Sequence, residues 1–220
     1  MPHRTGGYRR RICPVAFAAM PVLTRSFFNL AVIKAPLDSL VAAFSALPPP
    51  VSASAAPTPL TFPAQSYHAG PQDPPLLLWS PACAPELTAF MPRVSSGDYF
   101  VIEYACRRFG FAGVTARSST RDDESPINEF IAYESNQRRR VVRAMKDSPR
   151  WDFYTEGEPL HFEDQNAYTA RRVRDRLPRE AVLGYLAYWG APVREPTFWS
   201  SQRQALTLLP SAAGKPAAVA

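Results

Sequence analysis

Hydrophobic positions in this chain recur with two spacings, one typical of strands and one typical of helices. An aromatic and β-branched run over 27–33 predicts a first strand, because such side chains suit the half-buried surface of a sheet. From Leu37 to Leu47, apolar residues recur three and four positions apart, and Pro48 follows. This spacing predicts an amphipathic helix that ends at the proline. The fold is therefore expected to begin with a strand–helix unit.

A proline-rich stretch over 48–75 separates this unit from the rest of the chain. It holds nine of the 24 prolines and very little charge, so we expect an extended, mobile insertion rather than packed structure. The apolar run 76–79 then predicts another strand. Residues 85–91 begin with a proline and an acid, which predicts a short helix.

Five strand-like runs occupy the middle of the chain, with turn residues between them. They are 99–104, 109–115, 127–133, 140–145 and 151–155. Neighbouring strands joined by short turns pair most simply as an antiparallel meander.

The carboxyl-terminal part is predicted to be helical. Asp164 is placed to cap a first helix that runs to Leu177, and Pro178 starts a second helix that Gly190 ends. Residues 200–220 lack this periodicity and are expected to be a frayed tail. The predicted fold class is therefore α+β: a mostly antiparallel sheet, preceded by a strand–helix unit and covered by two carboxyl-terminal helices.

Positive charge is concentrated at the amino terminus. The formal charge is +6, but the first 25 residues contribute five arginines and no acid, which leaves 20 basic and 19 acidic residues, a net charge of +1. A nucleic-acid-binding domain usually carries its basic excess on the folded part, so a protein partner is favoured over nucleic acid. We expect 1–24 to be a disordered basic leader, or a start placed too early, and 25–199 to be a single domain.

An apolar run over 12–23 follows Arg9–Arg11, as it would in a secretory signal. Two prolines interrupt the run, and it is shorter than the roughly 20 residues that a bilayer crossing needs. We expect no membrane span and a cytoplasmic location, with export as the alternative.

The cysteines and histidines do not have the spacing of a metal site. Cys13, Cys83 and Cys106 are far apart, and the chain has only three histidines, whereas structural zinc sites use four ligands, usually in close pairs. We expect no metal and no cofactor. Free thiols are favoured, and a disulfide between Cys83 and Cys106 stays open.

A first acidic group, Asp122, Asp123 and Glu124, is a candidate partner-binding site. These carboxylates could hold a hard cation or meet a basic protein surface. They lack the alternating ligands and the turn glycine of a calcium loop, so a solvated loop is the main alternative to a metal site.

A second acidic group, Glu156, Glu158, Glu163 and Asp164, lies close in sequence to His161. Carboxylates beside a histidine can act as general acid and base. The sequence offers no nucleophile or oxyanion donor to accompany them, so we assign no catalytic residue and expect a non-enzymatic protein. Glu156 and Glu158 remain candidates for partner binding.

Arginines gather on the first predicted carboxyl-terminal helix, 164–176. Arg172 and Arg176 are four residues apart and would share one face of that helix. Such a face meets water, forms salt bridges with the neighbouring acids, docks to a protein, or contacts nucleic acid. Both arginines are therefore candidate partner-binding residues.

The carboxyl half also carries a distinctive pattern of aromatic and charged residues, which includes Trp151–Tyr154, Gly157–Leu160, Tyr168, Tyr185–Leu186 and Phe198–Trp199. Over 97–199 it resembles small bacterial proteins, some of which are immunity proteins of polymorphic toxin systems. The resemblance implies a cytoplasmic, non-enzymatic protein that binds and blocks a toxin domain. We therefore expect a protein-binding module that is immunity-like and toxin-neutralising. The alternative is a nucleic-acid-associated factor that uses helix 164–176.

Overall fold

The computed structural model describes residues 27–46, 51–62, 76–91, 99–120, 125–134 and 139–210, together with Leu23, Arg25 and Asp123. Its strands are β1 (Phe27–Ile33), β2 (Val51–Ala55), β3 (Leu76–Trp79), β4 (Thr88–Met91), β5 (Gly113–Ser119), β6 (Ile127–Tyr133), β7 (Arg139–Asp147), β8 (Arg150–Glu156) and β9 (Leu206–Pro210). Its α-helices are α1 (Leu37–Ser45), α2 (Tyr99–Phe109) and α3 (Arg179–Trp189), and its 3-10 helices are η1 (Ala167–Thr169), η2 (Val173–Asp175) and η3 (Pro196–Trp199).

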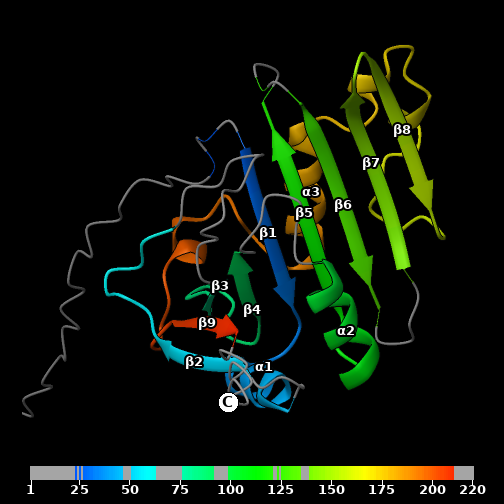
Figure 1. Ribbon diagram of the computed structural model, residues 1–220. Helices are drawn as coiled ribbons and strands as arrows, with labels where there is room; N and C mark the ends of the chain where they lie inside the picture. The colour runs from blue at the N-terminus through cyan, green and yellow to red at the C-terminus, as the bar shows by residue number, and fades with distance from the viewer. Residues whose placement is uncertain are drawn as a thin grey trace, which may run out of the picture.

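Within the described residues, the nine strands form one sheet in the order β2-β9-β3-β4-β1-β5-β6-β7-β8 (Figure 1). Every neighbouring pair in it is antiparallel. The predicted α+β class and the antiparallel sheet are therefore confirmed. The first strand of the predicted strand–helix unit lies at the centre of the sheet.

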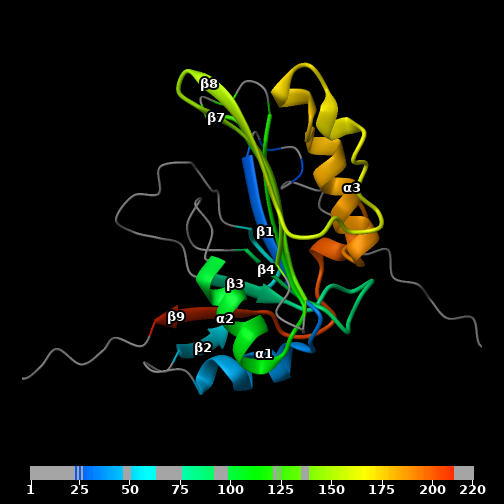
Figure 2. The same cartoon turned by 90° about the vertical axis from the view of Figure 1, so that its right-hand side faces the viewer.

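Helices lie on both faces of this sheet. Figure 2 shows α3 on one side of the long strands, and α1 and α2 on the other. We call the side that carries α2 the front face and the side that carries α3 the back face. Side chains alternate between the two faces along each strand, so β1 supplies Phe28, Leu30 and Val32 to the back core, and Ala31 and Ile33 to the front core.

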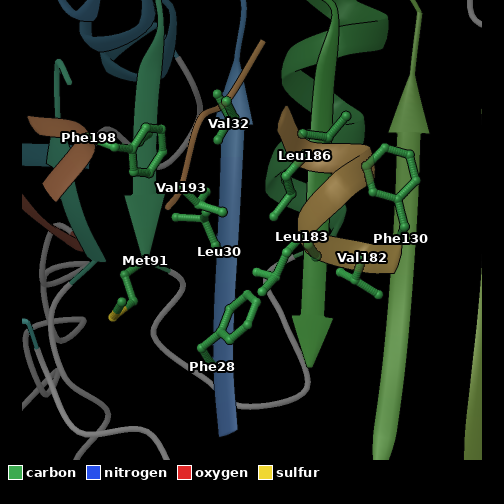
Figure 3. Packing of buried hydrophobic residues seen from close by; sticks show 14 of the residues in the cluster. Phe28, Leu30, Val32, Met91, Phe130, Val182, Leu183, Leu186, Val193 and Phe198 are labelled. Carbon is green, nitrogen blue, oxygen red and sulfur yellow. The ribbon is translucent and has the colours of Figure 1, made fainter. Parts of the chain in front are cut away.

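The back core is an apolar layer between the sheet and α3. In Figure 3, Leu30 of β1 and Phe130 of β6 lie close to Leu183 and Leu186 of α3. All of β1 is buried because it has a strand on each side and an apolar core on each face. Burial of apolar side chains, at about 25 cal/mol per Å², is the main force that holds these layers together.

Four aromatic rings anchor the β3 side of the back core. Trp79 packs edge-on against Phe62 and Phe198, with ring centroids 5.2 and 6.0 Å away, and its centroid lies 5.9 Å from that of Trp199. The indole N–H of Trp79 donates to the backbone oxygen of Phe198 at 2.7 Å. Together these contacts fix η3 against the sheet, although η3 is distant from β3 in sequence.

Elements with a clear local pattern were predicted correctly. The strand over 27–33 and the strand over 127–133 are β1 and β6. The predicted helix from Pro178 is α3, and Gly190 ends it in the left-handed conformation with φ +108°. A residue without a Cβ adopts that conformation at little cost.

Two segments in the middle of the chain were predicted wrongly. Residues 85–91 do not form a helix, because Thr88–Met91 is the buried strand β4. Residues 99–104 are not a strand, because they begin α2. In α2, Ile102, Ala105 and Cys106 all lie buried against the front face, and that spacing of three and four residues fits a helix better than a strand.

The prediction of a helix over 164–177 is also wrong. Asp164 does cap a turn, since its Oδ1 accepts hydrogen bonds from the backbone N–H groups of Asn166 and Ala167 at 3.1 and 3.3 Å. The turn then ends at Ala170, whose ψ is 136°, and only the short 3-10 helices η1 and η2 form. Among the described residues, one carboxyl-terminal α-helix therefore covers the sheet instead of two.

Parts of the predicted insertion and of the predicted tail belong to the sheet. Residues 51–55 of the stretch 48–75 form β2, and residues 206–210 of the stretch 200–220 form β9, which pairs with both β2 and β3. Sequence periodicity missed these strands because each is short and each depends on a partner distant in the chain. Residues 1–22, 63–75 and 211–220 lie outside the described residues.

Two further expectations are addressed by the structure. Cys83 is exposed, Cys106 is buried, and both are free thiols, so they do not form a disulfide with each other. None of the helices in the described part of the chain combines the length and the apolar character needed to cross a membrane.

Candidate functional site

A row of polar side chains crosses the front face of the sheet. It consists of Asn29, Arg117, Glu129, Arg143 and Tyr154, from β1, β5, β6, β7 and β8, and each residue is the direct Cα partner of the next. Residues directly opposite each other in antiparallel strands point to the same face. We call this set the polar row.

The centre of the polar row is a buried carboxylate between two arginines. The side chain of Glu129 is only 3% exposed, and the Nε of Arg117 lies 2.8 Å from its Oε1. The Nη1 of Arg143 lies 3.9 Å from its Oε2. Burial of a lone carboxylate is costly, and these guanidinium groups offset that cost. Arg143 extends from this ion pair towards the surface, where its side chain is 32% exposed.

The exposed end of the polar row is Tyr154. Its side chain extends onto the surface, where it is 42% exposed, and the Arg143 guanidinium lies 5.4 Å from the ring centroid. The phenol donates a hydrogen bond to Oε2 of Glu156 at 2.8 Å. Glu156 in turn lies 3.4 Å from Nη1 of Arg139. A large aromatic side chain is thus held from two sides on a strand.

This hydrogen bond also affects the protonation of the tyrosine. Because the phenol donates a hydrogen bond to the Glu156 carboxylate, and that carboxylate adds negative charge nearby, the pKa of Tyr154 is raised above its ordinary value. The hydroxyl group is therefore a hydrogen-bond donor at neutral pH, and it is not a candidate for a phenolate nucleophile.

A second ion pair, on the back face, fixes the chain after β8. The Arg140 guanidinium donates to Glu163, with Nη2 to Oε2 at 2.6 Å and Nε to Oε1 at 2.9 Å. Its Nη1 also donates to the backbone oxygen of Gly157 at 2.8 Å. Tyr168 donates to Oε2 of Glu163 at 2.8 Å, and its hydroxyl lies 3.0 Å from that of Tyr185. We call Arg140, Glu163, Tyr168 and Tyr185 the clamp.

The environment of the clamp shifts the pKa of Glu163 and the pKa of Tyr185 in opposite directions. Burial alone would raise the pKa of Glu163, but hydrogen bonds from Arg140, from the Leu160 N–H group and from Tyr168 together lower it below the ordinary value. Burial raises the pKa of Tyr185. Glu163 is therefore an ionised structural residue, and it is committed to Arg140 rather than to proton transfer with His161.

Gly157 shapes the turn between β8 and the clamp. Its φ is +79°, and a Cβ at this position would lie 2.1 Å from the backbone oxygen of Arg139. Both the backbone conformation and the lack of space therefore require glycine. The turn brings Glu156 close to Arg139 and leaves Glu158 exposed.

The acidic candidates from the sequence lie in different environments. Asp122 and Glu124 lie outside the described residues. Asp123 is half-buried and accepts a hydrogen bond from the backbone N–H of Ser125 at 3.1 Å, which is a turn contact. Glu156 belongs to the surface around Tyr154, whereas Glu158 is exposed beyond the end of β8.

The predicted pairing of Arg172 and Arg176 on a helix face is corrected by the structure, because residues 164–176 do not form that helix. Arg172 is exposed, just before η2. Arg176 is half-buried: its Nε donates to the backbone oxygen of Ala170 at 3.0 Å, and its guanidinium lies 5.5 Å from the Phe153 ring centroid. Its role is therefore in packing the loop against β8.

Sequence reasoning missed Glu129 and Arg143 as candidates for the site, and it noted Tyr154 only as one of the aromatic residues of the carboxyl half. A signal was present, because Glu129 is a charged residue within the largely apolar run 127–133. The alignment of the three residues depends on strand register, which the sequence pattern alone did not supply.

Two further features of the described residues bear on metal and ligand binding. No group of three or more His, Cys, Asp and Glu residues lies close enough to hold a metal ion. A cavity of about 260 Å³ lies between β8 and the start of α3 and includes Trp151, Arg174 and Asp175 in its lining. Its charged residues balance, since two arginines, Arg174 and Arg179, and two acids, Asp175 and Glu180, line it.

Comparisons of the chain with family models, with curated proteins and with solved structures gave no match. Its function is therefore inferred from the geometry of its own surface.

Proposed function

We propose that this chain is a non-enzymatic protein-binding module, and that the protein it binds is a toxin domain that it neutralises. The binding surface is the front face of β7 and β8, centred on Tyr154. The observation that carries the proposal is the fixation of this exposed tyrosine between Arg143 and Glu156.

A fixed tyrosine is well suited to anchor a protein interface. Tyrosine and arginine are enriched among the residues that contribute most binding energy, because they bury large areas and can also form hydrogen bonds. Holding the side chain in place before binding lowers the entropy cost of association. Tyr154 meets both conditions, since Arg143 contacts its ring and Glu156 holds its hydroxyl.

Charged residues surround Tyr154 on the same face of the sheet. Arg139, Arg143 and Glu156 lie next to it, and Arg150 and Asp152 occupy the same face of β8. An aromatic centre with a polar border is the usual anatomy of a protein interface. Charges of both signs favour a partner with a matching pattern over one that is uniformly charged, such as nucleic acid.

The test measures binding to the product of the neighbouring gene, which is the candidate toxin. Isothermal titration with the wild-type chain is compared with titration of Tyr154→Ala. Truncation of an anchor residue costs about 2 kcal/mol or more, which corresponds to roughly 30-fold weaker binding. Tyr188→Ala is the matched control, because Tyr188 is 72% exposed on α3 and lies on the other side of the sheet.

A growth assay supplies the second readout. Wild-type chain and Tyr188→Ala are expected to protect cells that express the neighbouring protein, and Tyr154→Ala is expected to protect them less. The proposal fails if the wild type neither binds nor protects, or if Tyr154→Ala behaves like the control in both measurements.

A further inference from the structure

Strand β8 is an edge strand whose outer side has no neighbouring strand in the described part of the chain. It is seven residues long and contains no proline or lysine. Natural proteins usually protect such edges with proline, lysine, bulges or very short strands, because an open edge can pair with another chain. One backbone group here is occupied, since the Glu156 oxygen accepts from Nη1 of Arg140 at 3.2 Å.

The sequence of β8 is complementary to itself when two copies run antiparallel. A pairing centred on Phe153 places Arg150 of each copy opposite Glu156 of the other. It also places Trp151 opposite Thr155, and Phe153 opposite its own copy. Opposite charges and aromatic pairs across strands each contribute about 0.2–1 kcal/mol.

Neighbouring registers of the same pairing are unfavourable. A shift of two residues in one direction places Asp152 opposite Asp152. A shift in the other direction places Asp152 opposite Glu156 twice. Like charges directly opposite each other destabilise a strand pair, and a shift of one residue would turn the side chains to opposite faces. Among these neighbouring registers, the one centred on Phe153 is therefore the one that gives opposite charges without a like-charged pair.

The other edge strand of the sheet, β2, has no charged or aromatic residues that would select one pairing register. Strand β2 has the sequence Val51–Ala55, VSASA, which contains no charge and no aromatic ring. Charge complementarity is thus a property of the β8 edge.

We infer that β8 pairs with β8 of a second copy of this chain, antiparallel and centred on Phe153, to form a symmetric dimer with one continuous sheet. The two-fold axis passes between the two Phe153 residues, as in an isologous interface. The same register places Asp152 of each copy opposite Tyr154 of the other, so the dimer interface borders the surface around Tyr154. Sedimentation of the chain without a partner protein measures the dimer separately from the proposed toxin binding.

The test uses the full chain and measures its mass by sedimentation over a range of concentrations. Wild type is expected to sediment at twice the 24.4 kDa of one chain. Arg150→Glu places a second carboxylate opposite Glu156 at both ends of the interface, and it is expected to raise the dimer dissociation constant at least tenfold. Lys146→Glu makes the same charge change at an exposed position on β7, away from the edge, and is expected to leave the constant unchanged.

A mixture of two variants gives the decisive measurement. Arg150→Glu and Glu156→Arg each place like charges together in their own dimers, but a mixed dimer has an opposite-charge pair at both ends. Mixing is therefore expected to restore the dimer that each variant alone has lost. Circular dichroism of each variant confirms that it is folded, since Glu156 also contacts Tyr154 and Arg139 within one copy.

Three results would overturn the inference. The first is a wild-type chain that stays at the mass of one copy at every concentration. The second is a dimer that Arg150→Glu does not weaken. The third is a mixture of folded variants that does not dimerise better than either variant alone.

Discussion

Glu129 and Glu163 are buried carboxylates on opposite faces of the sheet, and arginines hold both. Glu129 lies between Arg117 and Arg143 and so helps to fix the surface around Tyr154. Glu163 is held by Arg140 and fixes the turn after β8. A buried ion pair contributes little net stability relative to apolar residues of the same size, but the loss of one partner leaves an uncompensated charge.

Arg140→Met therefore tests the clamp directly. The substitution leaves the Glu163 carboxylate buried, and it also removes the donor to the Gly157 oxygen. We expect the free energy of unfolding to fall by about 3–5 kcal/mol, measured by urea denaturation. Arg194→Met is the control, because Arg194 pairs with Glu180 on the exposed surface, and exposed pairs contribute about 0–1 kcal/mol. Equal losses in the two variants would contradict a special role for the clamp.

Glu163 also gives the protein a defined dependence on pH. Its pKa in the folded state is lowered from the ordinary 4.5, so the unfolded chain binds its proton first as the pH falls. The stabilisation is therefore complete above pH 4.5 and is lost as the pH falls through the lower, folded-state pKa. We expect the difference in unfolding free energy between wild type and Glu163→Gln to shrink in that acid range, measured by urea denaturation from pH 6 to pH 3. A difference that stays constant with pH would contradict the shifted pKa.

At the level of elements, the sequence was informative where local pattern and final environment agree. The residue pattern over 127–133 is typical of a strand, and the pattern that follows Pro178 is typical of an amphipathic helix. Both elements formed as predicted. Residues 99–104 are aromatic and β-branched, which favours a strand locally. Burial of Ile102, Ala105 and Cys106 on one side of α2 outweighed that preference.

The candidate site was less predictable than the elements that carry it. Glu156 was identified from the sequence as a charged residue in a turn region, and it does lie beside Tyr154. The alignment of Glu129, Arg143 and Tyr154 depends on the registers β6–β7 and β7–β8. A shift of one residue would place these side chains on the other face, so local patterns alone could not bring them together.

Strand β9 is short, but it contributes to the stability of the front core through its pairing with β2 and β3. Leu208 is 3% exposed in the front core, and it lies opposite Ala53 of β2 and Leu76 of β3. We expect Leu208→Ala to lower the free energy of unfolding by about 2–5 kcal/mol, because it leaves a cavity between two strands. Thr207→Ala, on the same strand, removes an exposed hydrogen bond to Ser54 and should cost about 1 kcal/mol. Chemical denaturation measures both, and an equally small loss for Leu208→Ala would mean that β9 adds little to the core.

At the scale of the whole molecule, β1 connects the two cores and both halves of the sheet. It pairs with β4 on one side and with β5 on the other. Its back-face residues Leu30 and Val32 contact the core under α3, and its front-face residue Ile33 belongs to the core with α1 and α2. Loss of β1 would expose the apolar residues of both cores at once. Neither half of the sheet can therefore keep its core buried without β1.

This arrangement predicts that the described fold unfolds in one cooperative step. Trp79 lies on β3, in one half of the sheet, and Trp151 lies on β8, at the far edge of the other half. In a protein labelled with fluorotryptophan, the native fluorine signals of the two residues are expected to disappear at the same urea concentration, because small domains without separable parts unfold as a unit. Assignment by Trp79→Phe and Trp151→Phe identifies each signal. Two separate midpoints would instead mean that the β2-β9-β3-β4 half unfolds without the β5–β8 half, and that β1 does not couple the two cores.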